Sequence, residues 1–259
     1  MGKNKLARWA EVETFSNVIQ PGTDHKPGTN HPLRGQWRKL VFRNDNPVVL
    51  ELGCGKGEYT TGLSALLPGC NYVGVDIKGA RIWRGAKTAT ENKTVNAAFL
   101  RTRIEFIGSF FGNDEVDEIW ITFPDPHPGK RNSNKRLTCP WFLNTYRSFL
   151  KDRGIIHLKT DNRELFDYTL RLASENSPEI LFSTTDMDTM SMEKVIVPGD
   201  LYPEPDDTGQ KARISEGILS IKTHYESMFR DKGLKINYLA FRLEKDKVIS
   251  NDRERKSGE

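Results

Sequence analysis

A chain of 259 residues, of which 36% are hydrophobic, is long enough to bury one sizeable core. Its 39 Lys and Arg against 35 Asp and Glu give a net charge of +4, too small to identify a nucleic-acid partner by itself. No apolar run approaches the roughly 20 residues of a membrane span, and the first residues lack the apolar region of a signal peptide. Three widely spaced cysteines without a CxxC pair indicate neither a disulfide framework nor a zinc site. We therefore expect a cytoplasmic protein with no membrane partner and no metal.

The first 45 residues form a basic arm. Its basic residues outnumber its acidic ones and are Lys3, Lys5, Arg8, Lys26, Arg34, Arg38, Lys39 and Arg43. Two interpretations remain open at this point, a solvated and loosely folded arm or an arm that contacts phosphates.

From residue 47 onward, short runs rich in Val and Ile alternate with longer amphipathic segments. This pattern is typical of a parallel sheet with helices on both faces, an α/β fold. It predicts strands over 47–52, 71–76, 97–102, 116–122, 153–159, 179–186 and 234–243, and helices over 57–67, 79–94, 139–151, 162–176 and 214–231. A long loop follows residue 188. We expect one domain over 46–244 and a disordered tail over 245–259.

The first predicted strand of this domain runs directly into a glycine-rich turn. Residues 48–52, VVLEL, are followed by GCGKG at 53–57 and then at once by a predicted helix. Glycines there let the backbone turn sharply and approach a ligand that lies across the strand ends. The spacing differs from the dinucleotide GxGxxG, and the turn lacks the GK[ST] ending of a P-loop. Neither a nicotinamide nor a nucleoside triphosphate is favoured.

Two acidic residues near this turn point to a cationic nucleoside cofactor. Asp76 ends the next strand, 19 positions after Gly57, where doubly wound folds place the carboxylate that binds ribose hydroxyls. Glu51 precedes the glycines and adds negative charge beside a sulfonium and an ammonium group. The combination predicts S-adenosyl-L-methionine, bound by Glu51, Gly53, Gly55 and Asp76. The competing interpretation is a structural turn in which Asp76 is only a helix cap.

The strand predicted over 116–122 leads into the loop FPDPHP at 123–128. Three prolines around Asp125 make this loop stiff, and it lies at the carboxyl edge of the sheet, where ligands bind in open α/β folds. We expect Asp125 to be held beside the transferring methyl group, although an ordinary proline-stiffened turn is an alternative. A basic run follows at Lys130, Arg131, Lys135 and Arg136.

A second carboxylate, Asp161, ends the next strand, and its alternative role is to cap the following helix. Two carboxylates over one cleft suit a guanine, whose N1–H and N2 amine donate hydrogen bonds, while the basic run at 130–136 contacts phosphates. Guanine N7 has a lone pair and no proton to lose, so methylation there needs no general base. We therefore interpret His127 as a loop or RNA contact.

These motifs resemble those of the bacterial tRNA (guanine-N7-)-methyltransferases. The segments that carry the resemblance are ELGCGKGEYT at 51–60, VGVDIKGARIWRGAK at 73–87, ITFPDPHPGKR at 121–131, KRLT at 135–138, LKTDNRELFDYTL at 158–170 and THYE at 223–226. They follow the family's order through most of the chain. The FPDP and LKTDN elements are specific to this family rather than to methyltransferases in general.

The resemblance implies a Rossmann-like class I methyltransferase fold with a seven-stranded, mostly parallel sheet and an antiparallel last strand. It implies an enzyme of tRNA modification that methylates N7 of a guanine in the tRNA variable loop (tRNA position 46). The sequence leaves the oligomeric state open, with a monomer favoured. Asp125 is then the catalytic residue. The implied cofactor-binding residues are Glu51, Gly53, Gly55, Asp76, Arg103 and Asp125, and the implied substrate-binding residues are Gly129, Lys130, Asp161, Thr223, His224, Tyr225 and Glu226.

The chain departs from the family pattern at two places. Arg103 stands in a segment where the family often has an acidic or amide residue that contacts the adenine. Gly129 replaces the first lysine of the usual PxPKKR run, so Lys130 is expected to take its place.

Other functions remain open on the sequence alone. The PDP element loosely resembles the [ND]PP[YF] loops of amino-group methyltransferases, but Phe123 precedes the aspartate instead of following the prolines. A non-catalytic RNA-binding module is disfavoured by the intact Glu51, Asp76, Asp125 and Asp161. A small-molecule methyltransferase leaves the basic arm and the 130–136 run without a partner.

Overall fold

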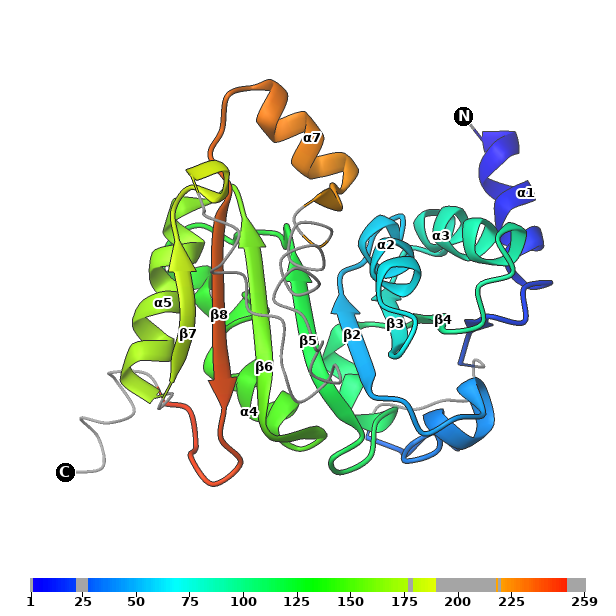
Figure 1. The fold of residues 1–259 in the computed structure, drawn as a ribbon, viewed down its shortest axis with the longest axis horizontal. Coiled ribbons are helices and arrows are strands. Elements are labelled where there is room, and N and C mark those ends of the chain that lie inside the picture. Colours follow the sequence, from blue (N-terminus) through cyan, green and yellow to red (C-terminus); the bar gives the residue numbers. More distant parts are fainter. Residues whose placement is uncertain (1, 22–27, 177–178, 190–217, 219, 251–259) are drawn as a thin grey trace, which may run out of the picture.

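The computed structural model describes residues 2–21, 28–176, 179–189, 218 and 220–250 (Figure 1). Most of the loop predicted after residue 188, and the beginning of the helix predicted near 214–231, lie outside these residues. No helix among the described residues has both the length and the apolar character to cross a membrane.

The chain folds around one eight-stranded sheet with the order β1-β4-β3-β2-β5-β6-β8-β7 (Figure 1). Its strands are β1 (Val18–Ile19), β2 (Val48–Leu52), β3 (Asn71–Asp76), β4 (Ala97–Arg101), β5 (Val116–Thr122), β6 (Leu150–Thr160), β7 (Ile180–Thr184) and β8 (Asn237–Leu243). Only β8 runs antiparallel to its neighbours, β6 and β7. The Rossmann-like, mostly parallel sheet with an antiparallel last strand is therefore confirmed. The eighth strand is β1, two residues of the basic arm that pair with β4 and were not predicted.

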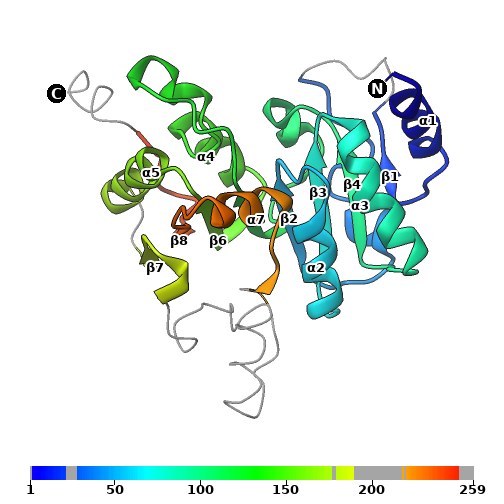
Figure 2. The ribbon, with the colours of Figure 1, turned by 90° about the horizontal axis from the view of Figure 1, so that it is seen from above.

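Helices cover both faces of the sheet (Figure 2). They are α1 (Gly2–Val12), α2 (Glu58–Leu66), α3 (Gly79–Glu91), α4 (Pro140–Arg147), α5 (Arg163–Asn176) and α7 (His224–Asp231), with short turns η1 (Trp37–Phe42), η2 (Ile104–Ser109), η3 (Lys130–Lys135) and η4 (Met187–Thr189). The larger core lies between the sheet and α4, α5 and η1. A second core lies on the opposite face beneath α2 and α7. Helix α4 ends earlier than predicted because Phe149 and Leu150 are buried at the start of β6.

The basic arm is attached to this domain by its own side chains. Trp37 is fully buried in the larger core, and its Nε1 donates to the carbonyl oxygen of Phe110 at 2.8 Å. The carboxylate of Glu115 accepts the backbone N–H of Trp37 at 2.8 Å. Nearer the N-terminus, the carboxylate of Glu11 on α1 accepts a hydrogen bond from Nε1 of Trp83 and forms an ion pair with Lys87, both on α3. Both α1 and the later part of the arm therefore pack against the domain.

The end of the chain is also held in place as far as Ser250. Asn144 of α4 donates to the carbonyl oxygen of Ile249 at 2.8 Å and accepts its backbone N–H at 2.9 Å. Asn176 of α5 contacts Ser250 in the same way. The expected disordered tail from residue 245 is thus packed over its first six residues, and residues 251–259 lie outside the described part of the chain.

Candidate active site

A cavity of about 930 Å³ opens at the carboxyl ends of the parallel strands. It is lined by the segments that follow β2, β3, β4, β5 and β6 and by the start of α7: residues 53–56, 76–78, 102–105, 122–127, Asp161 and 223–225. The order of the strands changes direction at β2, and ligands of doubly wound sheets bind at such a point. The cavity is therefore the candidate active site.

The glycine-rich turn after β2 forms one wall. Gly53, Gly55 and Gly57 have φ angles of 79°, 57° and 71°, which disfavour residues with a side chain. At Gly57 the packing also forbids one, because a Cβ there would lie 2.5 Å from the ring of Phe99. The turn brings bare backbone to the cavity, as the sequence predicted.

Asp76 ends β3 at the same wall and shapes the turn. Its Oδ2 accepts the backbone N–H of Gly55 at 3.0 Å, and its Oδ1 accepts that of Lys78 at 2.7 Å. Each carboxylate oxygen keeps a further lone pair, so ribose hydroxyls can still bind. Ile77 beside it lines the cavity with half of its surface exposed and offers an apolar contact for a purine ring.

Glu51 lies behind this wall rather than in it. It is 3% exposed, and Thr122, which lines the cavity, donates its hydroxyl to Oε1 at 2.7 Å. Oε2 accepts the backbone N–H of Thr60 at 2.9 Å and the Thr60 hydroxyl at 2.5 Å. Burial raises the pKa of Glu51 to about 7 despite these donors. A nearby cation would favour the ionised form.

The loop after β5 presents Asp125 to the cavity. Two non-glycine residues with left-handed φ, Phe123 at 48° and His127 at 44°, flank it on either side. Such conformations are strained for residues with a side chain and persist only where the surroundings impose them. Here the backbone N–H of Phe123 donates to the carbonyl oxygen of Lys159 on β6 at 2.8 Å. The prolines and this hydrogen bond hold the loop that carries Asp125.

Arg136 imposes the conformation from the other side, and the prediction that it contacts phosphates is wrong. Its side chain is 3% exposed, and Nε and Nη2 donate to the carbonyl oxygens of Pro126 and His127. It also pairs with Glu164 at 2.5 Å and lies over the ring of Tyr168. The three other basic residues of the run, Lys130, Arg131 and Lys135, are exposed.

Asp161 lines the cavity at the end of β6, and its alternative role as helix cap is not what the structure shows. Asn162 caps α5 instead, with its Oδ1 accepting the backbone N–H of Leu165 at 2.8 Å. Burial raises the pKa of Asp161. The carboxylate is thus left to face the cavity.

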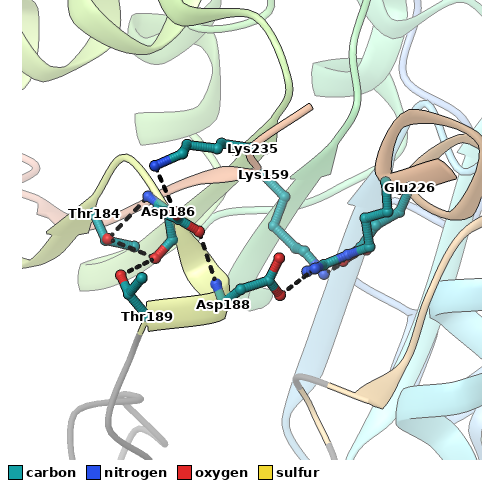
Figure 3. A network of polar contacts seen from close by, with 8 residues as sticks. Lys159, Thr184, Asp186, Asp188, Thr189, Glu226 and Lys235 are labelled. Carbon is teal, nitrogen blue, oxygen red and sulfur yellow. Dashed lines mark hydrogen bonds and ion pairs between the residues drawn. The ribbon is translucent and has the colours of Figure 1, made fainter. Parts of the chain in front are cut away.

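The first residues of α7 complete the rim. Thr223 caps the helix, with its hydroxyl accepting the backbone N–H of Glu226 at 3.1 Å, and it lines the cavity together with His224 and Tyr225. Glu226 does not line the cavity. It is fully buried and bonds to Lys159 of β6 and to Arg230, which also pairs with Asp188 (Figure 3).

The structure brings most of the predicted site residues together and leaves four aside. Gly53, Gly55, Asp76, Arg103, Asp125, Asp161, Thr223, His224 and Tyr225 all line the cavity, whereas Glu51, Gly129, Lys130 and Glu226 do not. Arg103 pairs with Glu105 at 2.9 Å at the rim. The sequence analysis missed Trp141, which lines the cavity while half exposed, and the buried Lys159. A lysine at the end of the apolar run Gly154–Leu158, which only His157 interrupts, was a signal for Lys159.

The donor set fits S-adenosyl-L-methionine. Bare glycine backbone, the Asp76 carboxylate, an exposed Ile77 and the negative charge of Glu51 suit a ligand that joins a nucleoside to cationic groups. No cluster of His, Cys, Asp and Glu among the described residues has the arrangement of a metal site.

Known proteins resemble this chain over most of its length. A family model described as "Putative methyltransferase" matches residues 45–236. The chain is 42% identical to a tRNA (guanine-N(7)-)-methyltransferase of Bacteroides fragilis, over 94% of this chain and 87% of that protein. It is 43% identical to the protein of the same name from Christiangramia forsetii, over 93% of this chain and 98% of that protein.

Solved structures resemble the fold at much lower identity. An antibiotic-related methyltransferase superposes with a TM-score of 0.51 at 14% identity, over 79% of this chain and 90% of that chain. A 30S ribosomal methyltransferase from an uncultured bacterium gives 0.50 at 14% identity, over 82% and 98% of the two chains. These likenesses concern the fold alone, a class I methyltransferase fold. The family model and the near full-length relatives show that the chain belongs to the tRNA (guanine-N7-)-methyltransferase family.

Proposed function

We propose that this protein transfers a methyl group from S-adenosyl-L-methionine to N7 of a guanine in tRNA. The observation that carries the proposal is one cavity lined by the glycine turn, Asp76 and the FPDP loop. The chain's relatives, matched over nearly their full length, are named tRNA (guanine-N(7)-)-methyltransferases. The guanine is expected in the tRNA variable loop (tRNA position 46).

The roles of the residues follow from where they lie. Backbone at Gly53 and Gly55 and the carboxylate of Asp76 bind the nucleoside part of the cofactor, while Glu51 supplies negative charge behind Thr122. When bound, S-adenosyl-L-methionine supplies an electrophilic methyl group on a sulfonium. Asp125 lines the same cavity and lies on a strained, rigid loop.

Methylation at N7 requires the protein to position the base and to stabilise charge, and it requires no proton transfer. Asp125 and Asp161 accept hydrogen bonds from the guanine N1–H and N2 amine and so orient the base. As the purine becomes cationic, the fixed carboxylate of Asp125 stabilises the developing positive charge. The exposed Lys130, Arg131 and Lys135 contact tRNA phosphates beside the cavity.

We further propose that residues 46–244, together with the arm residues packed against them, form the catalytic domain and that the protein acts as a monomer in the cytoplasm. Its three cysteines are free and buried, which fits a reducing compartment. Gel filtration with light scattering measures the oligomeric state.

The test is to incubate purified protein with radiolabelled S-adenosyl-L-methionine and unmodified tRNA, digest the RNA and identify the labelled nucleoside. N7-methylguanosine in the variable loop is the expected product. A methylated exocyclic amine would favour the amino-group alternative. Cofactor binding without any RNA product would leave a binding module.

A further inference from the structure

Lys159 and Glu226 form an ion pair that is closed off from solvent. Lys159 is 1% exposed and Glu226 is not exposed at all, and Nζ lies 2.8 Å from Oε2 (Figure 3). Lys159 is the second-last residue of β6, two residues before Asp161, and Glu226 is in the first turn of α7. The pair therefore joins the strand that ends at the cavity to the helix that begins there.

Both oxygens of Glu226 are engaged inside the protein. While Oε2 meets Lys159, Oε1 accepts from Nε and Nη2 of Arg230 at 3.1 Å and 3.0 Å. Arg230 in turn pairs with Asp188 of η4. Lys159 also lies over the ring of Tyr59 on α2, at 5.0 Å. Two cations and two carboxylates thus join α7 to β6 and η4, and Lys159 also contacts α2.

The residues just before Glu226 have the opposite environment. His224 and Tyr225 are exposed and line the cavity, and the hydroxyl of Thr223 caps the helix on the backbone N–H of Glu226. A buried charged pair whose partner is removed leaves an uncompensated charge at high cost, so the pair resists any displacement of the helix.

We infer that Glu226 is a positioning residue that fixes α7 to β6, and that it does not itself touch the tRNA. The pair holds His224 and Tyr225 at the cavity wall, where they meet the substrate. The inference deepens the proposed function and rests on it for the identity of that substrate. A direct tRNA contact would require an accessible carboxylate, which Glu226 lacks.

The first experiment measures the helix without any substrate. Hydrogen exchange is followed by mass spectrometry in the parent, Glu226→Gln and Lys159→Met, with Asp167→Asn as matched control. Asp167 pairs with Arg163 on the exposed side of α5, so its variant loses an ion pair on the surface only. We expect amides of α7 to exchange about tenfold faster or more in the first two variants and at the parent rate in the control.

The second experiment separates positioning from contact. Glu226→Gln, Lys159→Met and the double variant are assayed for KM and kcat with tRNA and for the Kd of S-adenosyl-L-methionine. If the pair acts as a unit, each single variant raises KM for tRNA by about tenfold. The KM of the double variant is then no higher than that of the more impaired single variant. The cofactor Kd stays at the parent value, and so does the salt dependence of tRNA binding, because no phosphate contact is lost.

Opposite results would overturn the inference. These are a Glu226→Gln protein that loses tRNA affinity with unchanged exchange in α7, or a Lys159→Met protein that methylates like the parent. Should Glu226→Gln fail to fold, Arg230→Gln removes the second, partly exposed cation and is read in the same way. A failed proposed function is recognised separately, because the parent would then not methylate tRNA, while the exchange results would stand unaltered.

Discussion

The guanidinium Nε of Arg136 donates to the carbonyl oxygen of Pro126 at 3.1 Å, one residue beyond Asp125. Nη2 reaches the carbonyl oxygen of His127 at 3.2 Å, and Glu164 of α5 neutralises the buried cation. Arg136 therefore fixes the loop that carries Asp125. This role cannot be read from the sequence, because Arg136 follows the exposed Lys135 in a run of basic residues.

Replacing Arg136 by Met is expected to slow methyl transfer without changing the electrostatic part of tRNA binding. The loop loses its donors, and a displacement of Asp125 by about 1 Å costs on the order of a hundredfold in rate. Single-turnover methylation at saturating tRNA measures the loss. The slope of log affinity against log salt should match the parent, and a clearly shallower slope would return Arg136 to the phosphate-binding residues.

Replacing Lys130 and Lys135 by Gln is expected to have the converse effect. Both side chains are exposed, Lys130 beside the cavity and Lys135 in its lining, so each can neutralise a phosphate. The slope of log affinity against log salt should become shallower by about 2, with the single-turnover rate at saturation retained. An unaltered slope would mean that these lysines are solvated surface.

The sequence predicted the sheet better than it predicted the site. The Val-rich and Ile-rich runs place β3 and β5 at their observed bounds, because buried parallel strands are continuous apolar segments. Arg136 looked like its neighbours, since nothing local reveals a partner as distant in sequence as Glu164. Glu226 was assigned to the substrate because the THYE segment at 223–226 resembles the family's motif. Its partner Lys159 is on β6, and the pairing exists only after the fold has formed.

Gly129 has a backbone conformation that a residue with a side chain does not readily adopt. Its φ of 81° and ψ of 152° are accessible mainly to glycine, and its N–H donates to Glu164 at 3.1 Å. Gly129→Lys is therefore expected to cost roughly 1–3 kcal/mol in the free energy of unfolding, although a Cβ meets no atom there. Urea denaturation measures the cost. Gly129→Ala is the control that adds strain without charge, and an equal loss in both variants assigns the effect to the backbone.

Glu51 makes a pH dependence predictable. Its folded pKa of about 7 exceeds the ordinary 4.5, so the folded protein holds this proton more tightly than the unfolded chain. The contribution of Glu51 to stability is therefore complete below about pH 4.5 and is lost as the pH rises to 7, a change on the order of 3 kcal/mol. The difference in unfolding free energy between the parent and Glu51→Gln, measured from pH 5 to 8, should follow this curve.

The same group links cofactor binding to pH. A cationic ligand favours the ionised carboxylate, so the affinity for S-adenosyl-L-methionine should increase from pH 6 to 8 in the parent. Glu51→Gln should bind more weakly and lose this dependence. Calorimetric titration in two buffers of different ionisation enthalpy also reports the proton that binding releases. A parent affinity independent of pH would separate Glu51 from the cofactor.

Asp125→Asn is expected to lower the rate of methyl transfer far more than it lowers tRNA affinity. The amide keeps the shape of the carboxylate and can still accept a hydrogen bond, but it carries no charge. Because the positive charge appears on the purine only during transfer, the lost stabilisation belongs mainly to the transition state. Single-turnover rates at saturating tRNA and cofactor should fall by about a hundredfold or more.

The loop itself supplies the control for this variant. Phe123 and His127 hold their left-handed φ through backbone contacts in which the Asp125 side chain takes no part, so Asp125→Asn should leave the loop in place. Unchanged stability and unchanged tRNA affinity are thus expected beside the slow rate. A variant within about threefold of the parent rate would show that Asp125 only shapes the loop, since a preorganised charge is worth far more than that.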